Sequence, residues 1–135
     1  MRKVAVIMGS TSDLPVAEKT IQTLKEYGIE TEVRVLSAHR CPNEAREFAA
    51  SARESGFSCI IALAGMAALL STVQMPSGIP VATVAVDGAK NAAILAVQIM
   101  AVTDAALAEK LQESRDEGTA AVLKADAELR ERYKN

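Results

Sequence analysis

Short runs of apolar and β-branched residues alternate with stretches of helical periodicity along most of this chain. The runs lie at residues 3–8, 31–36, 57–64 and 79–86, and helix-like stretches separate them. Apolar runs of this length are typical of strands buried in a parallel sheet, whose crossover connections are usually helices. The alternation therefore predicts an α/β fold with a parallel sheet, and 135 residues suffice for a single domain with its own core.

Proline and glycine mark the ends of the first predicted helix. Pro15 suits the first turn of a helix over residues 14–27, and Gly28 suits the position just after its end. Ser12 or Asp13 can cap its start. Further helices are predicted over residues 42–55, 67–75 and 89–102.

The predicted helix over residues 89–102 is apolar almost all round, because between residues 92 and 102 only Gln98 is polar. Such a helix is buried on all sides. A sheet this small covers only one side, so we expect a partner subunit to cover the rest. Residues 103–135 mix charges with leucine and valine and predict a helical tail. The tail is either solvated with one apolar stripe or packed on a neighbouring subunit of a homo-oligomer.

Composition excludes several kinds of ligand. A net charge of -2, two Phe, two Tyr and no Trp argue against a nucleic-acid or membrane-surface binder. Cys41, Cys59 and a single histidine provide neither a metal-ligand pattern nor a disulfide framework. No apolar stretch approaches the ~20 residues of a membrane helix, and the first run is too short for a signal peptide. We expect a soluble cytoplasmic protein with reduced thiols.

Polar or small residues follow the first three predicted strands. Ser10, Ser12 and Asp13 follow the first strand, and residues 37–40 (Ser-Ala-His-Arg) follow the second. Gly65 follows the third, where the missing side chain lets a ligand approach the backbone. Because ligands of open parallel sheets bind at the carboxyl ends of the strands, these three loops predict one binding crevice.

His39 and Arg40 predict the chemistry of that crevice. Histidine transfers protons near neutral pH, and arginine binds phosphate or carboxylate. Ser10 and Ser12 precede a helix whose free N–H groups favour an anion. No Walker lysine and no G-x-G-x-x-G motif is present, so a phosphorylated small molecule fits best. The alternatives are an ordinary surface loop for His39 and Arg40, and helix capping for Asp13.

Several motifs occur in the order of one known family. They lie at residues 8–13, 35–42, 73–78, 81–85 and 89–93. Together they resemble N5-carboxyaminoimidazole ribonucleotide mutase, also known as the small phosphoribosylaminoimidazole carboxylase subunit, over residues 4–123. The resemblance implies a flavodoxin-like three-layer α/β/α subunit with a C-terminal helical extension in a cytoplasmic homo-octamer. It also implies a purine-biosynthesis reaction without cofactor, metal or ATP, in which a carboxylate leaves nitrogen as CO2 and is added to C4.

The resemblance also implies roles for individual residues. His39 becomes the acid–base residue for both half-reactions, and Arg40 binds the substrate phosphate. Ser10 and Asp13 contact the ribose phosphate end. Secondary substrate-binding candidates are Ser12, Ser37 and Gly65.

The chain departs from the family after residue 67. A segment of roughly 30 residues, the size of one βαβ step, is missing before residue 69. The family places there a second histidine, a glycine-rich loop and an inner strand. Either the natural chain is longer than this sequence or the segment is deleted. The alternatives to a mutase are therefore a carboxylase that uses CO2 directly and an inactive ribonucleotide-binding or scaffold protein.

Overall fold

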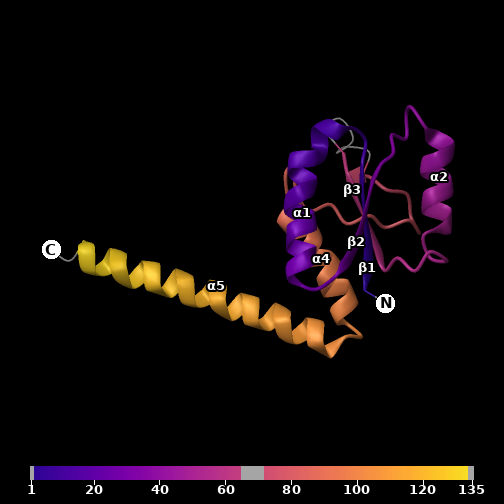
Figure 1. Cartoon of the computed structure of the whole chain (residues 1–135). Helices are drawn as coiled ribbons and strands as arrows, with labels where there is room; N and C mark the ends of the chain where they lie inside the picture. Colours follow the sequence, from indigo (N-terminus) through magenta and orange to yellow (C-terminus); the bar gives the residue numbers. More distant parts are fainter. Residues whose placement is uncertain (1, 65–71, 134–135) are drawn as a thin grey trace.

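A computed structural model describes residues 2–64 and 72–133 (Figure 1). Three parallel strands form its sheet in the order β2-β1-β3. They are β1 (Lys3–Met8), β2 (Glu30–Val35) and β3 (Cys59–Leu63). The strands predicted over residues 3–8, 31–36 and 57–64 are thus confirmed, with small differences at their ends.

The β1 strand lies in the middle of the sheet and carries its most deeply buried side chains. Val4, Val6 and Met8 are each at most 1% exposed. They face the same core cluster as Ile61 of β3, with Cys59 and Leu63 packed against it. Successive residues of a strand point to opposite faces, so this alternate set defines the face that the first helix layer covers.

That layer consists of α1 (Leu14–Glu26) and α4 (Ala89–Ala101), which pack against each other (Figure 1). Leu24 of α1 and Val97 of α4 are fully buried in the shared core. Thr20 is also fully buried, and its hydroxyl donates to the carbonyl of Ala89 at 3.1 Å. Gly28 ends α1 with a φ of 71°, a left-handed conformation that glycine adopts without strain.

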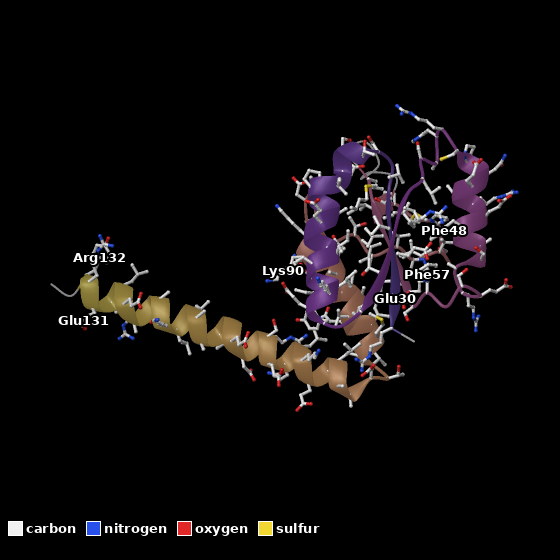
Figure 2. All side chains as sticks on the ribbon, in the orientation of Figure 1. Glu30, Phe48, Phe57, Lys90, Glu131 and Arg132 are labelled. Atoms are coloured by element: carbon white, nitrogen blue, oxygen red, sulfur yellow. The ribbon has the colours of Figure 1, made fainter. Side chains whose placement is uncertain are left out.

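The opposite face carries α2 (Pro42–Ser51), so the molecule has the predicted three layers (Figure 1). Figure 2 shows Phe48 of α2 and Phe57 together on this side, with ring centroids 5.5 Å apart. Lys3 and Arg34 lie over these rings. No residue of α2 is buried. The sequence predicts that the third strand is buried. This prediction is wrong on the face that carries α2, because Ile60 of β3 is 39% exposed there.

The prediction of a fourth strand over residues 79–86 is also wrong. These residues form no strand, and Ile79 and Val81 are 57% and 48% exposed. Within the described residues, no backbone hydrogen bond joins this segment to β3. A strand forms only where a neighbour pairs with its backbone, so β-branched composition alone does not suffice. Of the helix predicted over residues 67–75, residues 67–71 lie outside the described residues, and Thr72 and Val73 are helical.

The last helix, α5 (Ala105–Arg132), forms the C-terminal extension that the tail pattern predicts. Leu107 and Leu111 anchor its first turns in the core. Beyond them it projects away from the body (Figure 1). On α4, Ile99 is 54% exposed, so this chain does not cover that helix on all sides. Among the described residues, no helix combines the length and apolar character needed to cross a membrane.

Candidate active site

The carboxyl ends of the three strands lie at one level. Met8, the last residue of β1, pairs with Val35 and with Leu63, the last residues of β2 and β3. The N–H of Leu36 also donates to the Met8 carbonyl at 2.9 Å. The loops that follow β1 and β2 therefore start side by side at the same end of the sheet (Figure 1). This confirms the predicted alignment of strand ends.

The loop after β1 is held by hydrogen bonds between its own serines. Ser10 caps a short 3-10 helix (Thr11–Asp13), and its Oγ accepts from the Ser12 N–H at 3.2 Å. The Ser12 hydroxyl donates to the same oxygen at 3.0 Å. A hydroxyl that accepts two hydrogen bonds keeps its own proton available for a ligand oxygen.

Asp13 occupies the N-cap position of α1, but its side chain makes no capping hydrogen bond. The capping role weighed for Asp13 from the sequence is therefore not seen. The side chain is half-buried beside the exposed Ser10 and Ser12. A carboxylate without a helix partner at this edge of the sheet can accept hydrogen bonds from sugar hydroxyls.

The loop after β2 closes tightly on Ser37. The Ser37 carbonyl accepts from the N–H groups of Arg40 at 3.1 Å and of Cys41 at 2.8 Å. Its Oγ accepts from the Arg40 N–H at 3.3 Å. The Cys41 thiol completes the turn, because Sγ accepts from the Ser37 N–H at 3.1 Å and donates to the Ser37 carbonyl at 3.2 Å.

His39 and Arg40 lie within this turn and are exposed. Within residues 2–64 and 72–133, neither side chain has a hydrogen-bond or ion-pair partner. The backbone around them is fixed while their functional groups face solvent. The turn thus leaves an imidazole and a guanidinium exposed to solvent after the end of β2.

The clamp made by Cys41 is a feature that the sequence does not reveal. Its position after Arg40 is visible, but only the folded turn shows that Sγ meets both backbone groups of Ser37. Cys59 differs, because it lies at the core, where burial raises the pKa of its thiol. Both thiols are free in the structure.

No hydrogen bond joins the two loops to each other within the described residues, and Gly65, the predicted third element, lies outside them. Two hollows of the described surface lie away from these loops, one on α2 beside Glu44 and Phe48 and one at the base of α5 beside Arg2 and Met100. In the described part of the chain, no group of three or more His, Cys, Asp or Glu side chains could hold a metal ion.

A three-layer α/β/α body around a parallel sheet defines a flavodoxin-like α/β protein, a class whose ligands bind at the carboxyl ends of the strands. A family model described as AIR carboxylase matches residues 3–71 and 65–121. The chain therefore belongs to the AIR carboxylase family, which confirms the family resemblance.

The relatives carry consistent names. The N5-carboxyaminoimidazole ribonucleotide mutase of Methanocaldococcus jannaschii is 41% identical, with 97% of this chain and 99% of the relative covered. The protein of the same name from Pyrococcus horikoshii is 44% identical over 81% of this chain and 78% of the relative. The crystal structure of Treponema denticola PurE superposes with a TM-score of 0.76 at 26% identity, covering 94% of this chain and 98% of that chain.

The same alignments confirm that a segment is absent. The alignment with the Pyrococcus horikoshii relative has 138 positions but covers 81% of 135 residues, about 109, which leaves about 29 positions without a residue of this chain. The two family matches overlap at residues 65–71, so the family pattern is interrupted there. The interruption agrees with the predicted loss of roughly one βαβ step.

Proposed function

We propose that this chain is an N5-carboxyaminoimidazole ribonucleotide mutase of purine biosynthesis. The proposal is carried by His39 and Arg40, which are exposed on a turn whose backbone is fixed by hydrogen bonds. This turn and the Ser10–Asp13 loop follow neighbouring strands at the same end of the sheet. The names of the relatives agree with it. The product is the isomer in which the carboxylate has moved from the exocyclic nitrogen to C4, forming 4-carboxy-5-aminoimidazole ribonucleotide.

The proton balance of this isomerisation favours one acid–base group. When the N–C bond breaks and CO2 departs, the nitrogen gains a proton. When CO2 then bonds to C4, that carbon loses a proton. A single imidazole that donates one proton and removes the other returns to its starting state, and histidine titrates in the range this requires. We assign this role to His39.

The binding roles follow from charge and hydrogen-bond capacity. Arg40 binds the substrate phosphate through its guanidinium, and the free hydroxyl proton of Ser10 donates to a phosphate oxygen. The Asp13 carboxylate accepts from ribose hydroxyls. Ser12 and Ser37 are secondary binding residues, since their hydroxyls already hold the loops. The backbone at Gly65 is the proposed point of closest approach from the third strand end.

Assembly and location are also part of the proposal. We propose a homo-oligomer, with an octamer as the expected state, in which residues 103–135 pack on neighbouring subunits of a single-domain chain. Beyond Leu111, α5 has no buried residue, whereas most of the stability of helices in proteins comes from packing of an apolar face. A phosphorylated substrate does not cross membranes unaided, so we place the enzyme in the cytoplasm, where such a ribonucleotide is made.

A second candidate is favoured by the missing segment. Without about 29 residues at this edge, a chain that binds the ribonucleotide but does not turn it over is the alternative. Calorimetric titration with the substrate, beside an assay of product formation, separates the two. Binding with turnover supports the mutase, and binding without turnover supports the inactive protein. Turnover that requires added bicarbonate identifies a direct carboxylase instead.

A further inference from the structure

The helix that follows the His39–Arg40 turn has little packing of its own. α2 begins directly after this turn, and the N–H of Ala45 donates to the Cys41 carbonyl at 3.1 Å. A backbone hydrogen bond thus joins the turn to the helix. No residue of α2 is buried, and Ala45 and Phe48 are its only half-buried residues. The contacts that hold α2 on the sheet therefore also bear on the turn.

The sheet face under α2 carries charged side chains. Glu32 and Arg34 of β2 are two residues apart, so they point to the same face, and β1 contributes Lys3. Nζ of Lys3 lies 3.0 Å from Oε2 of Glu32. Nη1 of Arg34 donates to Oε1 of the same carboxylate at 3.4 Å. One carboxylate therefore pairs with both cations of this face.

Two aromatic rings lie against these cations (Figure 2). Cζ of Arg34 is 5.2 Å from the centre of the Phe48 ring, and Nζ of Lys3 is 4.4 Å from the centre of the Phe57 ring. The two rings contact each other, with their planes tilted by 43°. Cations over ring faces and tilted ring pairs are both favourable contacts. Glu32, the two cations and the two rings thus form a closed cycle of contacts.

Phe48 is the member of this cycle that belongs to α2. Its ring contacts Phe57 and the Arg34 guanidinium, so both contacts resist a tilt of the helix. Pro42, where α2 starts, is six residues or about 9 Å away along the helix axis. A tilt of about 10° at Phe48 therefore moves the start of α2 by roughly 1.5 Å. A misplacement of about 1 Å can slow an enzyme reaction roughly a hundredfold.

We propose that Phe48 is a positioning residue for the His39–Arg40 turn. Its ring, held by Phe57 and Arg34, sets the orientation of α2 and through it the placement of the imidazole and the guanidinium. The inference rests on the function proposed above, in which these two groups act on and bind the ribonucleotide. It adds that a contact on the α2 side of the sheet determines how well they do so.

Three substitutions test the role of the ring. Phe48→Leu keeps apolar bulk but loses the ring, and Phe48→Tyr is the conservative variant that keeps it. Arg34→Met removes the cation over the ring without altering the sequence of α2. In titration calorimetry, Phe48→Leu and Arg34→Met should bind N5-carboxyaminoimidazole ribonucleotide about threefold to tenfold more weakly than the parent. Phe48→Tyr should bind it as the parent does.

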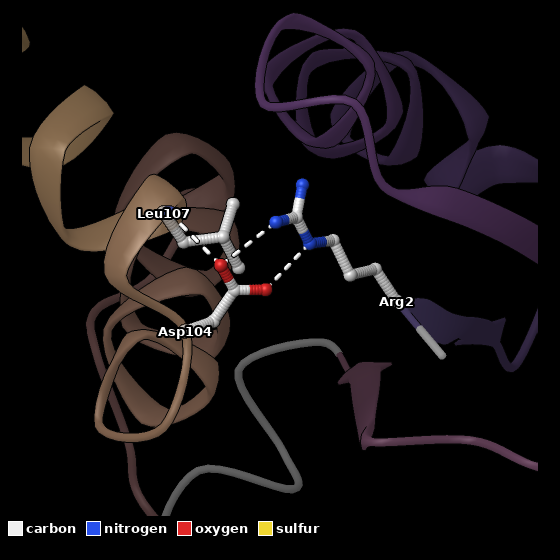
Figure 3. A network of polar contacts seen from close by, with 3 residues as sticks. All are labelled: Arg2, Asp104 and Leu107. Atoms are coloured by element: carbon white, nitrogen blue, oxygen red, sulfur yellow. Dashed lines mark hydrogen bonds and ion pairs between the residues drawn. The ribbon is translucent and has the colours of Figure 1, made fainter.

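Arg2→Gln is the matched control, because Arg2 makes a partly shielded ion pair outside this cycle. Its Nε donates to Oδ2 of Asp104 at 2.6 Å, and its Nη2 donates to Oδ1 at 2.7 Å (Figure 3). The pair joins the residue before β1 to the N-cap residue of α5. The side chains of Arg2 and Asp104 are 39% and 25% exposed. Arg2→Gln should therefore lower the stability of the protein and leave ribonucleotide binding unchanged.

His39 is the only histidine of the chain, which provides a readout that a loss of stability alone does not move. In protein with isotope-labelled histidine, its imidazole gives a single Cε1–H signal in a heteronuclear correlation spectrum. We expect this signal to shift or broaden in Phe48→Leu and Arg34→Met, and to match the parent in Phe48→Tyr and Arg2→Gln.

An unchanged His39 signal in both Phe48→Leu and Arg34→Met would overturn the positioning role. The two proposals fail separately. A parent that binds no ribonucleotide would overturn the proposed function, whereas a changed His39 signal in the same variants would still support the control of the turn by Phe48.

Discussion

The thiol of Cys41 and the backbone of Ser37 exchange two hydrogen bonds, with Sγ accepting from the N–H at 3.1 Å and donating to the carbonyl at 3.2 Å. His39 and Arg40 lie between them. The backbone geometry around the proposed acid–base and phosphate-binding groups therefore depends on a side chain whose thiol is hydrogen-bonded within the turn.

Replacement of Cys41 should separate turn geometry from thiol chemistry. Cys41→Ala removes both contacts and should lower the free energy of unfolding by about 1 kcal/mol, together with a several-fold loss of kcat. Cys41→Ser keeps a donor and an acceptor and should restore most of both. Urea unfolding and steady-state kinetics measure the two effects. A serine variant as impaired as the alanine variant would contradict the clamp.

Arg40 should govern affinity for the phosphate. Arg40→Gln removes a permanent charge and should weaken ribonucleotide binding by about tenfold to a hundredfold. Arg46→Gln, an exposed arginine on α2, is the matched control and should bind normally. Isothermal titration gives both dissociation constants. Equal binding by the two variants would remove Arg40 from the site.

Thr20 should stabilise the contact between α1 and α4. Thr20→Val keeps the shape of the buried side chain but loses the hydrogen bond to the Ala89 carbonyl, so we expect a loss of about 1 kcal/mol. Thr119→Val loses a similar bond to the Arg115 carbonyl on the exposed surface of α5 and should change stability little. Chemical denaturation of both variants at neutral pH provides the comparison.

The sequence predicted two kinds of element: a helix whose end signals lie within its own segment, and a strand at the centre of the sheet. Pro15 and Gly28 mark α1, and the β-branched run of β1 lies at the centre of the sheet, as its pattern indicates. Residues 79–86 have an equally good strand pattern, but strand formation also needs a neighbour, which no property of the segment itself supplies. The positions of the candidate loops were predictable, because strand ends in a parallel sheet meet at one edge.

Contacts between residues far apart in sequence could not be predicted in this way. Arg2 and Asp104 are 102 residues apart, and neither belongs to a recognisable motif. The Cys41–Ser37 contacts are local but depend on the exact turn. Their hydrogen-bond geometry exists only once the backbone has folded.

The Arg2–Asp104 pair should make stability depend on pH in the acid range. Hydrogen bonding to Arg2 holds the pKa of the Asp104 carboxyl below its ordinary value. A lowered pKa means that the stabilisation is present above the unfolded-state value, near 3.8, and is lost as pH falls through the lower folded-state value. The stability difference between the parent and Asp104→Asn should therefore be full at about pH 6 and shrink below about pH 4. A difference independent of pH would show that the charge is not responsible.

The proton-transfer role of His39 is tested most directly by the conversion of N5-carboxyaminoimidazole ribonucleotide by the purified chain, with its intact mass verified at 14.3 kDa. Formation of the C4 carboxylate is followed without added bicarbonate, in the parent and in His39→Asn. We expect turnover in the parent and a loss of about a hundredfold or more in the variant, with ribonucleotide binding retained. Full turnover by His39→Asn, or binding without turnover by the parent, would contradict the assignment of His39 as the proton-transfer residue of a mutase.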